Sequence, residues 1–228
     1  MTRNTRRTQR GETSLSRDSI IEAAIALLDA GGEAGLTFRA LSERLATGAG
    51  AIYWHVADKG DLLDAACDAV VARTMAVAAD SATPRERMRA IGVGMFDALD
   101  AHPWIGAELA RSPGALPMVR ILEGIGGQVR ALGVPPAGQW LAASTLLNYI
   151  LGVAGQNAAN ARVARRVGGE RPALLESVAA AWLRLDEQAY AFTRSVAAQL
   201  REHDDRADFM AGIDLILDGI EQARRPPP

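Results

Sequence analysis

Apolar residues recur at helical spacing along most of the chain, beginning at Ser16. Between positions 20 and 28 they fall at i, i+4, i+7 and i+8, which places them on one face of a helix, and the glycine pair at 31–32 is predicted to end it. Thr37 is a favourable N-cap for a second, short helix over residues 38–45. The pattern therefore predicts helices from the start of the folded region.

Two more helices are predicted directly after the second one. An Ala-Thr-Gly break at 46–48 precedes a short helix at about 49–55, and Asp58 caps a fourth helix that extends toward Ala79. Three short helices with a tight turn between the last two have the plan of a helix-turn-helix unit. In such a unit the last helix of the pair enters the major groove of DNA.

The rest of the chain is also predicted to be helical, with proline and glycine between the segments. The clearest interruption is residues 81–84, where Thr83 and Glu86 have the spacing of a capping box and Pro84 suits the first helical position. No segment alternates as a half-buried strand does, and no repeat of fixed period occurs. Further helices are predicted over residues 84–100, 103–111, 116–132, 136–165, 173–202 and 206–224.

Composition supports an all-α fold, and the predicted segments amount to about nine or ten helices. Of the 228 residues 49% are hydrophobic and only 5% are aromatic, so the side chains that strands favour are scarce. One cysteine, Cys67, excludes a disulfide framework and Cys-rich metal modules, and it fits a reducing, cytoplasmic setting. No apolar run approaches the ~18 residues of a membrane span, so we expect no membrane partner.

Charge is distributed unevenly along the chain. The total is −2, but residues 1–17 carry five arginines against one glutamate, a local excess of +4 that leaves −6 for the remainder. A basic arm of this kind is typical of contact with nucleic acid, and a merely solubilising tail is the alternative. The basic segment has no apolar core after it, so it is not expected to be a secretory signal.

A distinctive series of motifs runs from position 15 to 71. Gly35-Leu36-Thr37 leads into Arg39-x-Leu41-x-x-x-Leu45, and Ile52-Tyr53-Trp54-His55-Val56 is followed by Lys59 and Leu62-Leu63. In this order the motifs are similar to the DNA-binding domain of the tetracycline-repressor (TetR) family. The resemblance implies an N-terminal helix-turn-helix domain joined to a helical ligand-binding and dimerisation domain. It further implies a homodimer that binds a palindromic double-stranded DNA operator until a small-molecule effector releases it.

The resemblance also indicates which residues meet DNA. The first residues of the predicted recognition helix have no hydrogen-bonding side chain, so base recognition is expected from neighbouring residues. Arg39 resembles the family position whose guanidinium reaches a base or a phosphate, and the aromatic and imidazole groups at the end of the recognition helix resemble phosphate donors. Tyr53 as a packing residue is the alternative for that side chain, and Ile52 and Val56 are expected in the core. The predicted DNA-binding residues are Thr37, Arg39, Thr47, Gly48, Ala49, Gly50, Ala51, Tyr53, Trp54, His55 and Lys59.

The C-terminal part offers a dimer interface. The last helix has an apolar stripe that is wide for one-sided packing. By family resemblance it pairs with the helix at 136–165, where Gly152 and Gly155 predict a close helix contact. An intramolecular core for the same stripe is the alternative. The predicted interface residues are Leu147, Leu151, Phe209, Ile213, Ile216, Leu217 and Ile220.

The same part is expected to contain a ligand pocket, mostly apolar with a few polar groups. Taken alone, each candidate is more often a core residue than a pocket residue, and Asn148, Tyr149 and Gln156 on one helix are the sharpest prediction. We find no paired His and carboxylate for a magnesium–tetracycline site, and we predict no metal and no cofactor. The predicted ligand residues are Met75, Met95, Phe96, His102, Trp104, Met118, Trp140, Asn148, Tyr149, Gln156 and Trp182.

These features predict a DNA-binding transcriptional regulator, most simply a repressor released by a small apolar or aromatic ligand. A helix-turn-helix activator or architectural DNA-binding protein without an inducer is the alternative. No Gly-rich phosphate loop, HExxH or GxSxG motif occurs, so we do not expect an enzyme. The predicted domains are a flexible basic arm at 1–15, a helix-turn-helix domain at 16–71, a ligand-binding and dimerisation domain at 72–224 and a disordered tail at 225–228.

Overall fold

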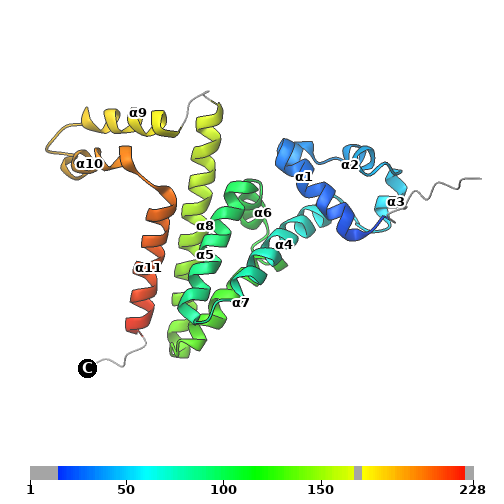
Figure 1. Ribbon diagram of the computed structural model, residues 1–228, viewed down its shortest axis with the longest axis horizontal. Coiled ribbons are helices and arrows are strands. Elements are labelled where there is room, and N and C mark those ends of the chain that lie inside the picture. The colour runs from blue at the N-terminus through cyan, green and yellow to red at the C-terminus, as the bar shows by residue number, and fades with distance from the viewer. Residues whose placement is uncertain (1–14, 167–170, 224–228) are drawn as a thin grey trace, which may run out of the picture. The chain divides into compact units, whose positions relative to one another are not determined.

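The structure, a computed structural model, describes residues 15–166 and 171–223, and most of these residues lie in helices. These residues form eleven α-helices and one short 3-10 helix with no strand, which confirms the all-α prediction (Figure 1). The predicted arm up to residue 14 and the predicted tail at 225–228 lie outside the described residues. In chain order the elements are α1 (Arg17–Gly35), α2 (Phe38–Leu45), α3 (Ala49–Tyr53), α4 (Lys59–Ala78), α5 (Pro84–Ala101), α6 (Ile105–Arg111), α7 (Leu116–Ala131), α8 (Pro136–Arg166), α9 (Arg171–Leu183), α10 (Ala191–Val196), η1 (Gln199–Glu202) and α11 (Asp205–Ala223).

The chain divides into two compact units, and the division falls between Ala66 and Cys67, inside α4. The domain boundary that we predict from sequence, after Val71, lies slightly further along the same helix. The N-terminal unit holds α1, α2, α3 and the start of α4. The C-terminal unit holds the rest of α4 and all later helices.

A capping box begins the first helix. The Ser16 hydroxyl accepts a hydrogen bond from the Ser19 N–H, and the Ser19 hydroxyl accepts one from the Ser16 N–H. The helical backbone of α1 is interrupted at Gly32, within the glycine pair that was predicted to end the helix. Gly32 takes a φ of 61°, and the helix resumes and ends at Gly35. Because glycine adopts positive φ readily, Gly32 accommodates this interruption.

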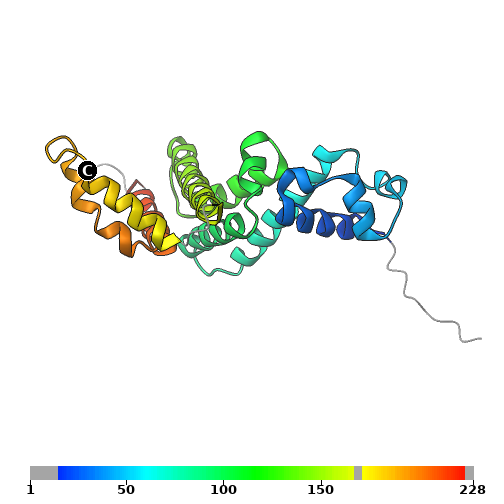
Figure 2. The same ribbon diagram turned by 90° about the horizontal axis from the view of Figure 1, so that it is seen from above.

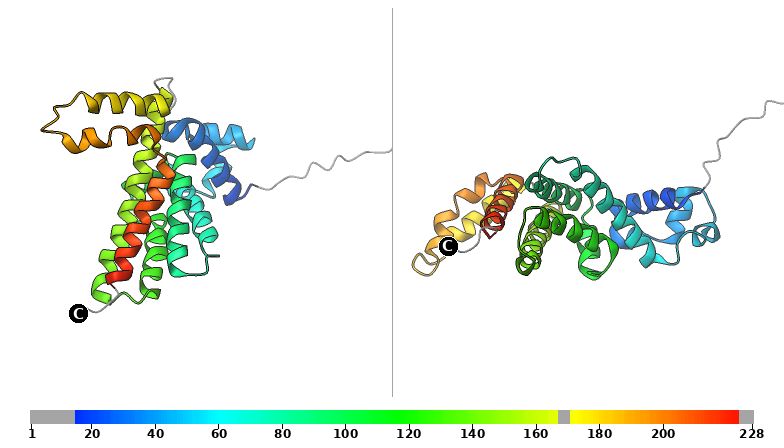
Figure 3. Two further views of the ribbon diagram at one scale, coloured as in Figure 1. Left: turned by 60° about the vertical axis from the view of Figure 1, so that its left-hand side comes forward. Right: turned by 90° about the horizontal axis from the view of Figure 1, so that it is seen from below.

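The C-terminal unit is built around α5, α7 and α8, which pack against one another, while α11 lies along both α5 and α8 (Figures 1 and 3). Thr83 caps α5 as predicted, and its hydroxyl accepts a hydrogen bond from the Glu86 N–H at 3.2 Å. The core between these helices is aliphatic and methionine-rich. Its buried side chains include Met88, Ile91, Met95, Ile121, Ile125, Val129, Leu146, Ile150, Ile213 and Leu217.

Two glycines allow α11 to approach its neighbours closely. A Cβ at Gly92 in α5 would overlap the Ile213 side chain, and a Cβ at Gly212 in α11 would overlap the Tyr149 hydroxyl of α8. That hydroxyl donates a 3.0 Å hydrogen bond to the Phe209 carbonyl oxygen, and the two aromatic rings stack with centroids 5.6 Å apart. Small residues at these two positions therefore determine how closely α11 packs.

The single helix predicted over 173–202 is wrong, because α9, α10 and η1 occupy this range and α9 and α10 lie against each other (Figure 2). The Asp186 carboxylate accepts a hydrogen bond from the Ala189 N–H at 2.8 Å, and the Arg194 guanidinium donates to the Leu185 carbonyl oxygen at 2.9 Å. These bonds satisfy backbone groups that helix ends leave open. No glycine or proline marks the break, so the sequence pattern carries no signal for it.

Candidate nucleic-acid interface and ligand cavity

The turn between α2 and α3 is held by hydrogen bonds to the backbone. The Thr37 hydroxyl accepts one from the Ala40 N–H at 3.1 Å, so α2 begins at its predicted N-cap. Ala46 takes a φ of 50°, and the Thr47 N–H donates to the Ser42 carbonyl oxygen at 3.0 Å. The chain therefore turns tightly from α2 into α3, as in a helix-turn-helix.

The beginning of α3 presents almost no side chains. Gly48, Ala49 and Gly50 are exposed and Ala51 is half-buried, whereas Ile52 is fully buried and anchors the helix. A Cβ at Gly50 would meet no atom within 4 Å. This surface can approach the floor of a groove and contact thymine methyl groups, but it provides no side-chain hydrogen bond to a base edge.

Two aromatic residues follow at the end of α3. Tyr53 stacks on Phe38 of α2 with ring centroids 4.4 Å apart, yet 54% of Tyr53 is exposed. Trp54 is 90% exposed. Exposed side chains with an O–H or N–H tip are suited to donate to phosphates, which position a protein on DNA without reading sequence. Tyr53 therefore combines packing with an exposed edge, so its two predicted roles are compatible.

Arg39 on α2 pairs with a carboxylate one helical turn further on. Its Nε lies 2.9 Å from Oε1 of Glu43, and both side chains are largely exposed, at 89% and 66%. The pair engages Nε of the guanidinium and leaves the two terminal NH₂ groups, the fork that binds O6 and N7 of guanine. The pairing with Glu43 was not predicted, although its i, i+4 spacing is visible in the sequence.

Lys59 has an internal partner that the sequence reasoning did not anticipate. Its Nζ donates a 2.7 Å hydrogen bond to the Glu33 carbonyl oxygen near the end of α1, where a cation stabilises the helix C-terminus. An ammonium has three N–H groups, so this bond leaves two for phosphate. The other predicted contacts, His55 and Thr47, are half-buried.

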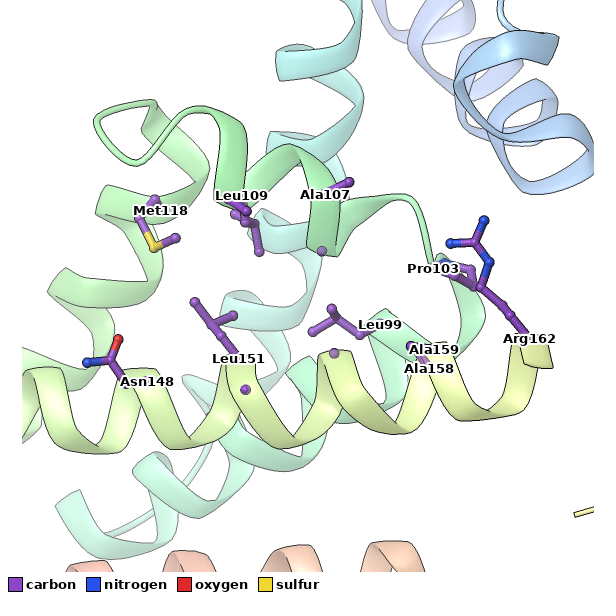
Figure 4. A pocket seen from close by; sticks show the side chains of 14 residues that line it. Leu99, Pro103, Ala107, Leu109, Met118, Asn148, Leu151, Ala158, Ala159 and Arg162 are labelled. Carbon is purple, nitrogen blue, oxygen red and sulfur yellow. The ribbon is translucent and has the colours of Figure 1, made fainter. Parts of the chain in front are cut away.

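A cavity of about 480 Å³ lies in the C-terminal unit among α5, α6, α7 and α8 (Figure 4). Its volume falls within the usual range of small-molecule sites. Two predicted ligand residues, Met118 and Asn148, line it, and so does Leu151, which we expected at a dimer interface. The lining residues are Leu99, Pro103, Gly106, Ala107, Leu109, Ala110, Met118, Asn148, Leu151, Gly152, Gly155, Ala158, Ala159 and Arg162.

The remaining predicted ligand residues are not brought together at this cavity. Met95, Phe96 and Trp104 are buried, and His102 meets Trp104 edge-on with ring centroids 6.2 Å apart. Trp140 is 70% exposed on α8 and does not line the cavity. Aromatic and methionine content alone therefore did not separate core residues from pocket residues.

A second cavity, of about 500 Å³, takes three more of the predicted ligand residues. Tyr149, Gln156 and Trp182 line it between α8, α9 and α11. Met75 belongs to neither cavity and lies instead beside α7, where a Cβ at Gly124 would stand 3.1 Å from its sulfur. The predicted ligand set is thus divided among two cavities, the core and the surface.

The sequence pattern did not indicate that the small-residue face of α8 and Arg162 would line a cavity. Ala158, Ala159 and Arg162 line the first cavity. The spacing of Gly152 and Gly155 predicts a close helix contact, whereas a Cβ at either position would meet nothing within 4 Å. Glycines that permit a helix contact and glycines that widen a cavity have the same pattern in sequence, and Arg162 belongs to no motif.

Most of the predicted dimer residues are buried within this one chain. Phe209, Ile213 and Leu217 are at most 1% exposed, because α11 packs on α5 and α8, and the alternative of an intramolecular core applies to these three. Ile220 and Leu147 are also buried, at 5% and 8% exposure. Most of the apolar stripe on α11 is therefore buried by packing within this chain.

Part of the α8–α11 surface remains open. Ile216 and Ile220 line an apolar groove of about 630 Å³ together with Leu141, which is 69% exposed. Trp140 and Leu215 are also exposed, at 70% and 74%. An apolar face of this kind on a helix pair is suited to contact with another protein surface.

No described residues form a group of three or more His, Cys, Asp or Glu side chains that could hold a metal ion. In the described ranges, none of the helices is both long enough and apolar enough for a membrane crossing.

The fold and the α2–α3 surface define a helix-turn-helix regulator of transcription. The profile of the family described as "Bacterial regulatory proteins, tetR family" matches residues 20–66. The structure of the transcriptional regulator SCO7222, a TetR from Streptomyces coelicolor, is similar to this chain with a TM-score of 0.85 and 50% sequence identity, over 93% of this chain and 100% of that one. The chain belongs to the TetR family, which is a family of DNA-binding regulators and not a class of enzymes.

Two further relatives extend the comparison. An HTH-type transcriptional regulator of Saccharopolyspora erythraea is 32% identical over 139 residues, which cover 60% of this chain and 59% of that protein. The chain thus matches about three-fifths of the length of this curated relative. BioQ, solved with its natural double-stranded DNA operator, is similar with a TM-score of 0.57 and 26% identity, over 92% of this chain and 99% of that one.

Proposed function

We propose that the chain is a homodimeric repressor that binds a palindromic double-stranded DNA operator and leaves it when a small apolar or aromatic molecule enters the cavity among α5, α6, α7 and α8. The helix-turn-helix unit supplies the DNA contacts, and the C-terminal unit supplies the ligand site and the dimer contact. The proposed DNA contacts are Thr37, Arg39, Thr47, Gly48, Ala49, Gly50, Ala51, Tyr53, Trp54, His55 and Lys59.

The observation that carries DNA binding is the exposed face of α2 and α3. It combines the exposed guanidinium of Arg39, the half-exposed ring of Tyr53 and the almost fully exposed ring of Trp54. A large aromatic side chain in water leaves apolar area unburied, and a DNA backbone provides both a contact surface and a phosphate acceptor. The similarity to BioQ, whose structure includes operator DNA, supports the same role for this face.

The cavity supports release by a ligand over the alternative of an activator or architectural protein without an inducer. A fully packed C-terminal core would favour the alternative, because nothing could then enter it. An opening of about 480 Å³ with a mostly apolar lining is instead suited to a small molecule.

Dimerisation is proposed through the apolar groove of α8 and α11. Leu141, Ile216 and Ile220 line the groove, and Trp140 is exposed on α8. A second copy of the chain on this face would bury these side chains and hold two helix-turn-helix units at a fixed spacing, roughly 34–36 Å for adjacent major grooves.

An electrophoretic mobility shift on duplex DNA flanking the gene of this chain tests the proposal. We expect a complex whose affinity falls steeply with salt, by about 10³-fold or more between 50 and 200 mM if six or more phosphates are contacted. The double variant Arg39→Ala, Tyr53→Phe should weaken the complex, while Arg184→Ala, which removes an exposed arginine of the C-terminal unit, should not. No salt-sensitive complex on any of these duplexes would contradict the proposal.

A further inference from the structure

The lining of the cavity among α5, α6, α7 and α8 is mostly apolar, with few polar residues. Twelve of its fourteen described lining residues are glycine, alanine, proline, leucine or methionine, and the two polar ones are Asn148 and Arg162. None of the fourteen is acidic. Among the described residues no carboxylate forms an ion pair with Arg162, although other surface arginines of this unit do, for example Arg206 with Asp97 at 3.1 Å.

The two polar residues lie at opposite ends of the cavity, and both belong to α8. They are fourteen positions apart, which corresponds to about 21 Å along a helix axis and returns to nearly the same helical face. Figure 4 shows Asn148 and Arg162 at the two ends, with Leu151 and Leu99 between them. The cavity is therefore elongated, apolar in its middle and cationic at one end.

The floor of the cavity between these ends is formed by helix backbone. Gly152 and Gly155 line it, and a Cβ at either glycine would meet no atom within 4 Å. Ala158 and Ala159 continue this surface toward Arg162. A strip without large side chains is flat, and a planar ring system can lie against it with continuous van der Waals contact.

We propose that this cavity binds an elongated, planar aromatic molecule with an anionic group at one end, the anion pairing with Arg162 and the rings lying on the Gly152–Gly155 strip. The guanidinium fork matches a carboxylate or sulfonate and forms charge-assisted hydrogen bonds to it. A cationic ligand is disfavoured, because it would meet the charge of Arg162 and no acidic lining residue. The inference rests on the proposed ligand role of the cavity and adds the chemical class of the ligand.

Two dyes with the same ring system separate the anion from the rings. 6-(p-Toluidino)-2-naphthalenesulfonate carries a sulfonate at one end of its ring system, and N-(4-methylphenyl)-2-naphthylamine has the same rings without it. Each is titrated by fluorescence into the full-length wild type and into the variants Arg162→Met, Gly155→Leu and Arg184→Met. Because leucine is a better helix former than glycine, Gly155→Leu fills the cavity without weakening α8, and circular dichroism checks that every variant is folded.

We expect Arg162→Met to weaken the sulfonate dye about tenfold or more relative to the neutral dye, as the loss of a charge-assisted hydrogen bond predicts. Gly155→Leu should weaken both dyes, and Arg184→Met, the control outside the cavity, should affect neither. If Arg162→Met changes both dyes equally or not at all while Gly155→Leu weakens both, the anionic class is wrong and the cavity remains a ligand site. If Gly155→Leu weakens neither dye, the cavity does not bind such a molecule at all. The mobility shift with operator DNA needs no dye, so failure of DNA binding is detected separately.

Discussion

We expect base discrimination to depend on Arg39. The first four residues of the predicted recognition helix, 48–51, have no hydrogen-bonding side chain. Arg39 is exposed, and its bond to Glu43 leaves the terminal NH₂ groups of the guanidinium available. A bidentate contact from these groups to guanine distinguishes it from the other bases in the major groove.

Replacing Arg39 should therefore change specificity as well as affinity. We expect Arg39→Ala to remove about 1–3 kcal/mol of discrimination at one base pair of each half-site. Arg39→Lys, which keeps the charge but loses the planar fork, should retain most of the overall affinity and lose most of the discrimination. Competition binding with duplexes that carry a single G·C to A·T change measures both quantities, and an equal loss on every sequence would show that Arg39 contacts phosphate alone.

Glu43 gives the matching test of how Arg39 is positioned. Glu43→Ala removes a negative charge from the proposed DNA face, so binding to non-specific DNA should become tighter. If the carboxylate orients the guanidinium, discrimination at the base read by Arg39 should decrease in the same variant. An increase in affinity on all sequences with discrimination unchanged would show that the ion pair has no positioning role.

Tyr53 should reveal its two roles through two substitutions. Tyr53→Phe keeps the stack on Phe38 and removes the hydroxyl, so DNA affinity should fall by about 1 kcal/mol while thermal stability is unchanged. Tyr53→Ala also removes the ring stack on Phe38 and should lower the free energy of unfolding by at least about 0.5–1.5 kcal/mol. Loss of stability in Tyr53→Phe would contradict an exposed hydroxyl that awaits a phosphate.

The packing of helix α11 against α8 depends on the absence of a side chain at Gly212. Alanine there would overlap the Tyr149 hydroxyl, so Gly212→Ala should lower the free energy of unfolding by about 1–3 kcal/mol through overpacking. Gly127→Ala on α7 is the control, because a Cβ there meets nothing within 4 Å and should raise stability by about 0.5–1 kcal/mol. Both are measured by urea unfolding at one protein concentration, and equal effects would mean that α11 does not pack against Tyr149 in this way.

Tyr149 also predicts an alkaline pH dependence of stability. Its burial, with a smaller contribution from the negative charge of Asp208, raises the pKa of the Tyr149 hydroxyl above the ordinary value. The folded protein then keeps the proton to a higher pH than the unfolded chain, whose tyrosines ionise near pH 10, so stability is lost as pH rises above about 10. At pH 8 the free energy of unfolding of the wild type should exceed that of Tyr149→Phe by about 1 kcal/mol, because of the hydrogen bond to Phe209. This difference in free energy should be smaller at pH 10.5. A constant difference would contradict the burial of this hydroxyl.

Helix starts were predictable from sequence because capping is local. Thr37 and Thr83 bind backbone N–H groups within their own first turn, and those interactions depend only on the neighbouring residues. The break inside 173–202 was not predictable, because it depends on Asp186 and Arg194, which are ordinary helix residues by composition. Local chemistry thus determines where helices begin, while polar side chains in a turn can end one without glycine or proline.

The candidate site was predictable only in its N-terminal part. The α2–α3 motif occupies one short stretch, so its spacing specifies the surface directly. The cavity instead lies among α5, α6, α7 and α8, so its lining depends on how helices far apart in the sequence pack. This packing buries Met95 in the core and places Arg162 at the cavity. Trp140 was predicted as a ligand residue because it is aromatic, but it is exposed on α8 and does not line the cavity.

The exposed apolar groove of α8 and α11 predicts that two copies of the chain associate. Leu141 lines the apolar groove of α8 and α11 and is 69% exposed, so Leu141→Glu should place a charge in the proposed interface and weaken self-association at least tenfold. Leu116→Glu is the control, because Leu116 is 57% exposed at the start of α7 and does not line the groove. Sedimentation equilibrium should show two chains for wild type and Leu116→Glu and mainly one for Leu141→Glu. A wild-type protein that sediments as one chain would contradict the proposed dimer.

Selection from a pool of random duplexes shows whether the protein recognises DNA by its sequence. The full-length protein is incubated with the pool at moderate salt, bound duplexes are recovered and amplified, and the enriched sequences are compared with those from Arg39→Ala. We predict an inverted repeat with a guanine at one position of each half-site, the two half-site centres about one helical turn apart, and loss of that guanine preference in the variant. Recovery of duplexes without any common sequence would show that the protein does not recognise DNA by its sequence, and an enriched motif that Arg39→Ala selects equally well would show that Arg39 reads no base.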